Sequence, residues 1–173
     1  YNGEPVGTVT MASPADAEQA MAVAVEPAES LTRYQRSQVL LEARDALLKE
    51  TESFAHLIMS ESGLCMRETR YEVGRASDVL QFAAMEALRD DGQIFSCDVS
   101  PQGKQRKIFT TREPVRLALA ITPFNHPLNQ VVHKLAPAVA AGVPVILKPP
   151  KRTPLTAVRL VELLYQAGLP ANM

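Results

Sequence analysis

The chain has 173 residues, a formal net charge of −1 and 21% charged residues, values that are ordinary for one globular domain with its own hydrophobic core. This charge balance gives no sign of a nucleic-acid-binding surface, and the longest apolar runs are far shorter than the ~20 residues of a membrane-spanning helix. The two cysteines, Cys65 and Cys97, form no CxxC pair and have no histidine at metal-ligand spacing. We therefore expect a cytoplasmic protein without a metal, membrane or nucleic-acid partner.

The first half of the chain predicts helices separated by short turns. Residues 1–11 predict a polar hairpin or loop that turns at residues 2–3. They show neither a signal pattern nor an initiator methionine, so we expect the chain to begin inside a longer protein. A helix should start at residues 13–14, where serine precedes proline, and stop near Pro27. Further helices are predicted over residues 32–50, 54–60 (before Gly63) and 67–88 (before residues 90–92).

The helix predicted over residues 67–88 has the clearest periodicity. Its apolar face consists of Val73, Ala76, Leu80, Ala83, Ala84 and Ala87. Glu72 and Arg75 are spaced to pair on its surface.

A β-hairpin is predicted over residues 93–112, where apolar segments flank a turn-rich stretch at residues 100–103. Its second strand has the basic residues Lys104, Arg106 and Lys107. Because a lone hairpin is marginally stable in water, we expect it to pair with another surface, such as a second subunit.

The last third of the sequence predicts a β-α-β-α unit. The strands are residues 117–121, an apolar run suited to burial on both faces, and residues 143–147. The first helix follows the turn at residues 122–127 and ends at Gly142; its apolar face is Leu128, Val132, Leu135 and Val139. The second, over residues 155–166, follows an N-cap and proline at Thr153-Pro154.

Both strand-to-helix turns of such a unit lie at one edge of the sheet, where open α/β sheets bind their ligands. Asn125 lies in the first turn, and Lys148 stands at the carboxyl end of the second strand. Pro123 and Pro127 make the first turn rigid. Two parallel strands do not form a stable open sheet, so we expect the fold to continue beyond Met173.

Three segments in this region, TPFNHPLN, HKLAPAVAAG and VILKPPKRTPLTA, closely resemble the aldehyde dehydrogenase superfamily. Weaker similarity extends upstream, through residues 61–63, Glu72-Val73 and residues 107–115. Two segments, residues 101–114 and 121–134, look most like the phosphonoacetaldehyde and glyceraldehyde-type dehydrogenases. The resemblance implies an α/β fold: a Rossmann-like cofactor-binding domain with a hairpin oligomerisation extension, incomplete in this chain. It implies residues 1–91 as the helical part of the cofactor domain, 92–112 as the hairpin, and 113–173 as the first β-α-β-α unit, with the catalytic domain absent.

The resemblance also implies the chemistry. The family oxidises an aldehyde to a carboxylic acid with NAD or NADP, through a thiohemiacetal formed on a cysteine. Asn125 matches the asparagine whose amide donates to the substrate oxyanion, and Lys134 a lysine associated with proton relay. Lys148 matches the lysine that binds the adenosine ribose. Four residues match positions that line the nicotinamide side of the cofactor cleft: Ile121, Thr122, Pro123 and Phe124.

Each of these residues also has a simpler interpretation. Asn125 can close its turn by bonding its own backbone, and Lys148 and Lys134 can be solvated surface lysines. Residues 121–124 can serve only turn and core packing. His126, which follows Asn125 where many members have phenylalanine, can contact a polar substrate or simply pack at the surface. We expect His56 and His133 to be structural.

The segment Pro149-Pro150-Lys151 departs from the family pattern. NAD-preferring members often have glutamate at position 151, where a carboxylate binds the ribose hydroxyls and repels a 2′-phosphate. Lys151 removes that repulsion, whereas Pro150 lacks a hydroxyl that could help bind the phosphate. The sequence therefore leaves NAD and NADP both open.

Neither Cys65 nor Cys97 lies in the family's catalytic-cysteine context, and the family's nucleophile and general-base glutamate lie beyond position 173. We therefore expect this fragment alone to be inactive, and the intact protein to be an aldehyde dehydrogenase that forms a homodimer or homotetramer. The alternative is a truncated, non-catalytic module for cofactor binding or assembly.

Overall fold

The computed structural model describes residues 3–26, 31–89 and 92–173. Its elements in chain order are α1 (Pro14–Val25), α2 (Arg33–Lys49), α3 (Thr51–Ser62), α4 (Met66–Ala87), β1 (Ile94–Ser96), β2 (Lys107–Phe109), β3 (Ala118–Ile121), α5 (Asn129–Ala141), β4 (Val145–Lys148) and α6 (Pro154–Gln166). The predicted helices, hairpin and β-α-β-α order are therefore confirmed. Every helix among the described residues is too short or too polar to cross a membrane.

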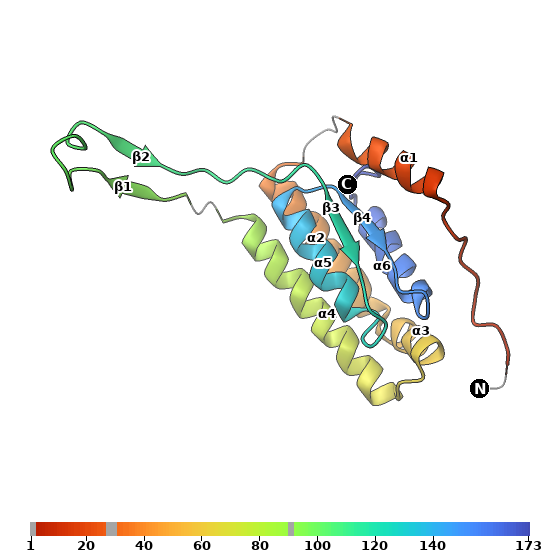
Figure 1. Ribbon diagram of the computed structural model, residues 1–173. Helices are drawn as coiled ribbons and strands as arrows, with labels where there is room; N and C mark the ends of the chain where they lie inside the picture. The colour runs from red at the N-terminus through yellow and green to blue at the C-terminus, as the bar shows by residue number, and fades with distance from the viewer. Residues whose placement is uncertain (1–2, 27–30, 90–91) are drawn as a thin grey trace.

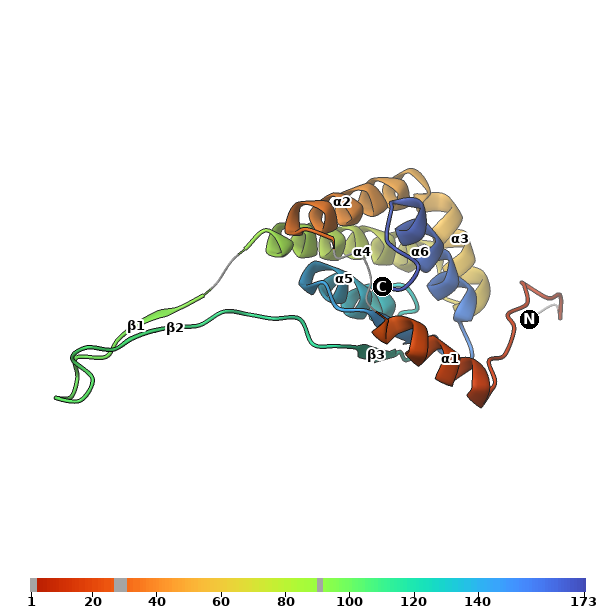
Figure 2. The same ribbon diagram turned by 90° about the horizontal axis from the view of Figure 1, so that it is seen from above.

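The elements form layers. Helices α2, α3 and α4 make one layer, α5 and α6 pack against it, and strands β3 and β4 lie on the other side of α5 (Figures 1 and 2). Helix α1 packs beside β4. The β1–β2 hairpin projects away from this body as a long arm (Figure 1).

The core lies between the helical layers. The face of α4 that the sequence predicts to be apolar is buried along its whole length. It packs against α2, α3 and α5, whose own buried side chains include Leu40, Phe54 and Leu128. Burying each such side chain stabilises the fold by about 1.5–3 kcal/mol.

Local signals set most helix ends. Helices α1 and α2 begin with capping boxes, in which the Ser13 and Thr32 hydroxyls each accept from a backbone N–H three residues later. Gly63 and Gly142 end α3 and α5 in the left-handed conformation, with φ of 76° and 72°. Both glycines are the stops that the sequence predicts.

Strands β3 and β4 pair in parallel, with Ala118 opposite Val145 and Ile121 opposite Lys148. The expectation that the first strand is buried on both faces is wrong for the described chain. Ala120 is buried, whereas Leu119 and Ile121 are 64% and 58% exposed. Successive side chains of a strand point to opposite faces, and only one face of β3 packs on α5.

Several local expectations need correction. Residues 3–13 contain neither helix nor strand, so the hairpin alternative is wrong there, and Asn2 lies outside the described residues, as do Pro27 and residues 90–91. Of the three basic residues expected on the second hairpin strand, only Lys107 lies in β2. Lys104 and Arg106 precede it, because β2 is only three residues long.

Candidate active site

The two strand-to-helix turns meet at the carboxyl edge of β3 and β4. The Thr122 backbone N–H and hydroxyl both donate to the Lys148 carbonyl, at 3.4 Å each. The Arg152 guanidinium lies 4.8 Å from the centroid of the Phe124 ring, a distance at which a cation is attracted to an aromatic face. The structure therefore joins the two segments that the sequence places at one edge.

Asn125 is exposed on the first turn, and its side chain forms no hydrogen bond within the described chain. The interpretation that its amide only closes the turn through its own backbone is therefore wrong. An exposed amide at a rigid, proline-flanked turn offers two N–H donors to a ligand oxygen.

The second turn presents positive charge to solvent. Lys148 and Lys151 are exposed, whereas Pro150 between them is buried. The Lys148 ammonium donates to the Pro149 carbonyl at 3.3 Å, so it lies over its own turn. With Arg152 beside them, these cations suit a phosphate-bearing ligand.

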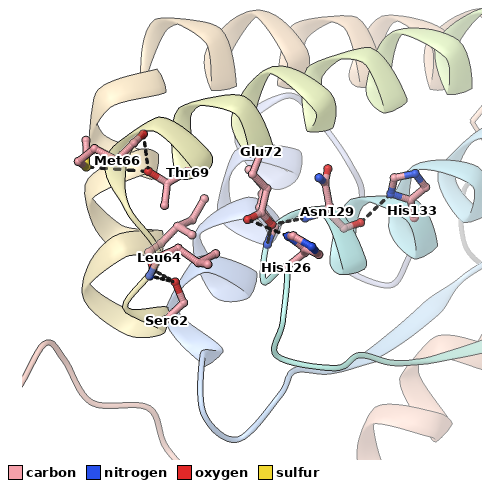
Figure 3. Close-up of polar contacts among 10 residues, drawn as sticks. Ser62, Leu64, Met66, Thr69, Glu72, His126, Asn129 and His133 are labelled. Carbon is pink, nitrogen blue, oxygen red and sulfur yellow. Dashed lines mark hydrogen bonds and ion pairs between the residues drawn. The ribbon is translucent and has the colours of Figure 1, made fainter.

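Glu72 is the site residue that sequence reasoning missed. The expected surface pair with Arg75 is wrong, because the Glu72 side chain is only 2% exposed. One carboxylate oxygen accepts the backbone N–H groups of Leu128 and Asn129 at 2.8 and 2.9 Å, at the start of α5 (Figure 3). Glu72 lies four positions before Ala76 of the apolar face, and this helical spacing was a signal that Glu72 can point inward.

The second oxygen of Glu72, Oε2, has no hydrogen-bond partner among the described residues. It faces Nδ1 of His126 at 3.8 Å, next to Asn125 in the chain (Figure 3). Burial raises the pKa of the Glu72 carboxyl, and this effect outweighs the two backbone N–H groups and His126, which lower it. His126 therefore contacts a buried carboxylate, although its own side chain is 55% exposed.

Glu61, on α3, caps α6 in the same way. Its carboxylate accepts from the backbone N–H groups of Leu155 and Thr156 at 2.5 and 2.8 Å, and from the Thr156 hydroxyl at 2.5 Å. Thr153 occupies the N-cap position, but the expected side-chain cap is wrong, because its buried hydroxyl has no partner among the described residues. Nothing in the local sequence signals this cap, since its partners lie 94 and 95 residues away.

The other end of α5 is held by Arg36 on α2. Its guanidinium donates to the Ala140 carbonyl at 3.0 Å and to the Leu31 carbonyl at 2.6 Å. Burial, with a smaller effect from Arg33, lowers the pKa of Arg36. Helix α5 thus has a carboxylate at its N-terminus and a cation near its C-terminus, the arrangement that its dipole favours.

The remaining candidates lie apart from these contacts. Lys134 is exposed on α5 and forms no hydrogen bond or ion pair within the described chain. Nδ1 of His133 is 2.8 Å from the Asn129 carbonyl oxygen, a contact within one turn of α5. Cys65 is exposed at the start of α4, and Cys97 lies in the hairpin. Within the described ranges no cluster of side chains is suited to hold a metal ion.

The sequence matches the model of the aldehyde dehydrogenase family over residues 1–173. It is 42% identical over 171 residues to a 3-sulfolactaldehyde dehydrogenase of Priestia aryabhattai, covering 98% of this chain and 36% of that protein. The chain thus spans about a third of that relative's length.

Solved structures of the family have the same fold. Aldehyde dehydrogenase 21 from Physcomitrella patens, in complex with the reaction product succinate, superposes with a TM-score of 0.88 at 35% identity, over 93% of this chain and 34% of that one. A glyceraldehyde-3-phosphate dehydrogenase from Methanocaldococcus jannaschii, complexed with NADP, gives 0.89 at 29% identity, over 99% and 38%. The α/β fold is therefore part of the aldehyde dehydrogenase fold.

Proposed function

This chain belongs to the aldehyde dehydrogenase family, and we propose that the intact protein oxidises an aldehyde to a carboxylic acid with NAD or NADP. The nicotinamide takes a hydride from the substrate carbon, and water supplies the second oxygen of the acid. The nucleophilic cysteine and the general base come from outside residues 1–173. This chain contributes the oxyanion donor and part of the cofactor site.

The observation that carries the proposal is the exposed Asn125 amide on a turn that is rigid and tied to the core. An oxyanion donor acts best when it is already oriented toward the place where the negative charge develops. Glu72 fixes the start of α5, which begins four residues after Asn125. The Asn125 side-chain amide forms no hydrogen bond within the described chain, so its N–H groups are available to a substrate oxygen. Lys134, a turn or more further along α5, is the proposed participant in proton relay.

The cofactor would lie along the sheet edge. Lys148 would bind the adenosine ribose, with Pro150 and Lys151 beside it, and residues 121–124 would line the nicotinamide side. The exposed cations of the second turn suit the phosphates of a dinucleotide. In support, similar structures include one described as NAD-dependent and two complexed with NADP.

Assembly into a homodimer or homotetramer through the β1–β2 hairpin is part of the proposal. Ile94, Ile108 and Phe109 are 87%, 51% and 73% exposed on this arm. Two short paired strands with exposed apolar side chains gain stability by pairing with another surface.

A competing function is a non-catalytic module that binds a nucleotide or assembles with other chains. This alternative predicts nucleotide binding without aldehyde-dependent reduction of the nucleotide. It is favoured by the position of Cys65 and Cys97 outside the two turns, because a chain limited to these cysteines has no nucleophile beside Asn125.

The test uses the natural full-length protein, incubated with a panel of aldehydes and either NAD or NADP, and follows reduced nucleotide by absorbance. The proposal expects turnover in the wild type and a loss of about a hundred- to a thousandfold in kcat for Asn125→Ala. A matched control is Asn172→Ala, near the amino end of β4, which should leave turnover unchanged. Nucleotide binding without any turnover would favour the competing module instead.

A further inference from the structure

We propose that Glu61 and Glu72 are positioning residues, each of which holds one of the two turns of the site in place. Glu72 positions the turn with Asn125, and Glu61 positions the turn with Lys148 and Lys151. Neither glutamate touches the reacting atoms in this account. The inference rests on the proposed function, because it assigns each turn a step in aldehyde oxidation.

The contrast with the other helix starts separates these two caps from ordinary ones. Helices α1 and α2 are capped by side chains three residues away within their own segments. Helices α5 and α6 are capped by carboxylates that reach from the helical layer, 56 and 94 residues earlier in the chain. A local cap moves with its helix, whereas a cap from another layer fixes the helix start relative to the core.

The link from Glu72 to Asn125 is short and stiff. Glu72 binds the N–H groups of Leu128 and Asn129, and Pro127 immediately precedes them. Proline fixes one torsion of its own residue and restricts the residue before it. Few free torsions therefore separate the carboxylate from the Asn125 amide, and Oε2 of Glu72 also faces the intervening His126.

The link from Glu61 to the second turn has the same character. Glu61 binds the N–H groups of Leu155 and Thr156, directly after Pro154. The Thr153 hydroxyl has no partner among the described residues, so it does not replace this cap. Loss of Glu61 would therefore loosen the cationic turn directly, whereas Glu72 would still hold the turn that carries Asn125.

The experiment uses the full-length protein and measures kcat and the KM for NAD or NADP at saturating aldehyde. Glu72→Ala should lower kcat about a hundredfold, the effect of a small misplacement of a catalytic group, with the nucleotide KM near its wild-type value. Glu61→Ala should raise the nucleotide KM several-fold and restore a near-normal kcat at saturating nucleotide. Glu52→Ala, which removes a carboxylate that pairs with Arg70 at the surface, should change neither constant.

Two further variants separate positioning from a general loss of stability. Glu72→Gln keeps an oxygen that accepts both N–H groups, so it should recover most of the kcat lost in Glu72→Ala. The double variant Glu72→Ala/Asn125→Ala should be no slower than Asn125→Ala alone, because Glu72 acts only through Asn125. If Glu72→Ala does not fold, Glu72→Asp, whose oxygen is withdrawn by one methylene, should show the same fall in kcat.

The proposal is overturned if both glutamate variants change the same constant, or if the effects of Glu72→Ala and Asn125→Ala multiply. A wild-type protein that binds nucleotide but oxidises no aldehyde would refute the proposed function. In that case the separate roles of Glu61 and Glu72 would be tested by the affinity of the protein for the nucleotide. Glu61→Ala should weaken nucleotide binding, and Glu72→Ala should not. Equal weakening by both variants, or no nucleotide binding by the wild type, would overturn the division as well.

Discussion

Replacing Arg36 with methionine should destabilise the protein by detaching the C-terminal end of α5 from α2. Methionine keeps the apolar stem of the side chain but removes the donors to the Ala140 and Leu31 carbonyls. The change also removes the cation near the negative end of the α5 dipole. The site lies at the other end of this helix, so Arg36→Met is a test of stability alone.

The magnitude follows from these contacts. Each hydrogen bond contributes about 1 kcal/mol net, and a cation at a helix C-terminus adds about 0.3–1 kcal/mol. Part of this is offset, because burial of the guanidinium, which lowers the pKa of Arg36, is relieved in the variant. We expect a loss of about 2 kcal/mol, or a fall in Tm of about 4–8 °C for a domain of this size.

Urea denaturation followed by circular dichroism measures the loss, with an unchanged slope showing that the unfolding transition is the same. Arg67→Met is the control, because within the described residues Arg67 pairs only with the adjacent, exposed Glu68, in a contact of little energetic value. Arg36→Lys keeps the charge on a single ammonium and should recover only part of the stability. A loss equal to that of Arg67→Met would refute the reasoning.

Three other predictions concern the same elements. Burial raises the pKa of Glu72 in the folded protein above its unfolded value near 4.5. The protonated Glu72 carboxyl therefore stabilises the fold fully below the unfolded pKa, and this contribution is lost as pH rises through the folded pKa. Because glutamine does not titrate, the unfolding free energy of Glu72→Gln should increase relative to that of the wild type as pH rises from below 4.5 through the folded pKa of Glu72. Gly142→Ala should lower the unfolding free energy by about 1–2 kcal/mol, because φ is +72° and the new Cβ would lie 3.0 Å from Arg36 Nη1. As its control, Gly74→Ala adds a methyl group in open space on α4 and should raise the unfolding free energy by about 0.5–1 kcal/mol in the same urea titration. Lys151→Glu should shift the ratio of kcat/KM values toward NAD and away from NADP, because a carboxylate repels the 2′-phosphate.

Local signals account for the parts of the fold that the sequence predicts correctly. The serine and threonine at the starts of α1 and α2, the glycines after α3 and α5, and the apolar face of α4 all act within one or two helical turns. Such signals depend only on neighbouring residues, so they can be interpreted without knowing how distant segments pack. The position of Asn125 and Lys148 at one edge follows from the strand order, and the pairing of Ile121 with Lys148 confirms it.

The side chains that hold this edge could not be predicted in the same way. Glu72, Glu61 and Arg36 each bind a backbone group 56 to 104 residues away. Helical spacing places Glu72 near both Arg75 and the apolar face of its own helix, but it does not identify the backbone groups that Glu72 binds. An inward-pointing carboxylate looks costly in sequence, because burying an unpaired charge is unfavourable. The N–H groups at the start of α5 offset part of that cost, and they become partners of Glu72 only once α4 and α5 pack together.

The two ends of α5 allow stability and catalysis to be separated within one helix. A helix of 13 residues is about 20 Å long, so Arg36 acts far from Asn125 while Glu72 acts beside it. Arg36→Met and Glu72→Ala each remove a charged group that complements the dipole of α5, so both should lower the unfolding free energy. Only the loss of Glu72 should lower kcat, because only that end of α5 is joined to Asn125 through a proline-restricted turn. Equal losses of kcat in Arg36→Met and Glu72→Ala would mean that catalysis follows the stability of α5 rather than the position of the turn.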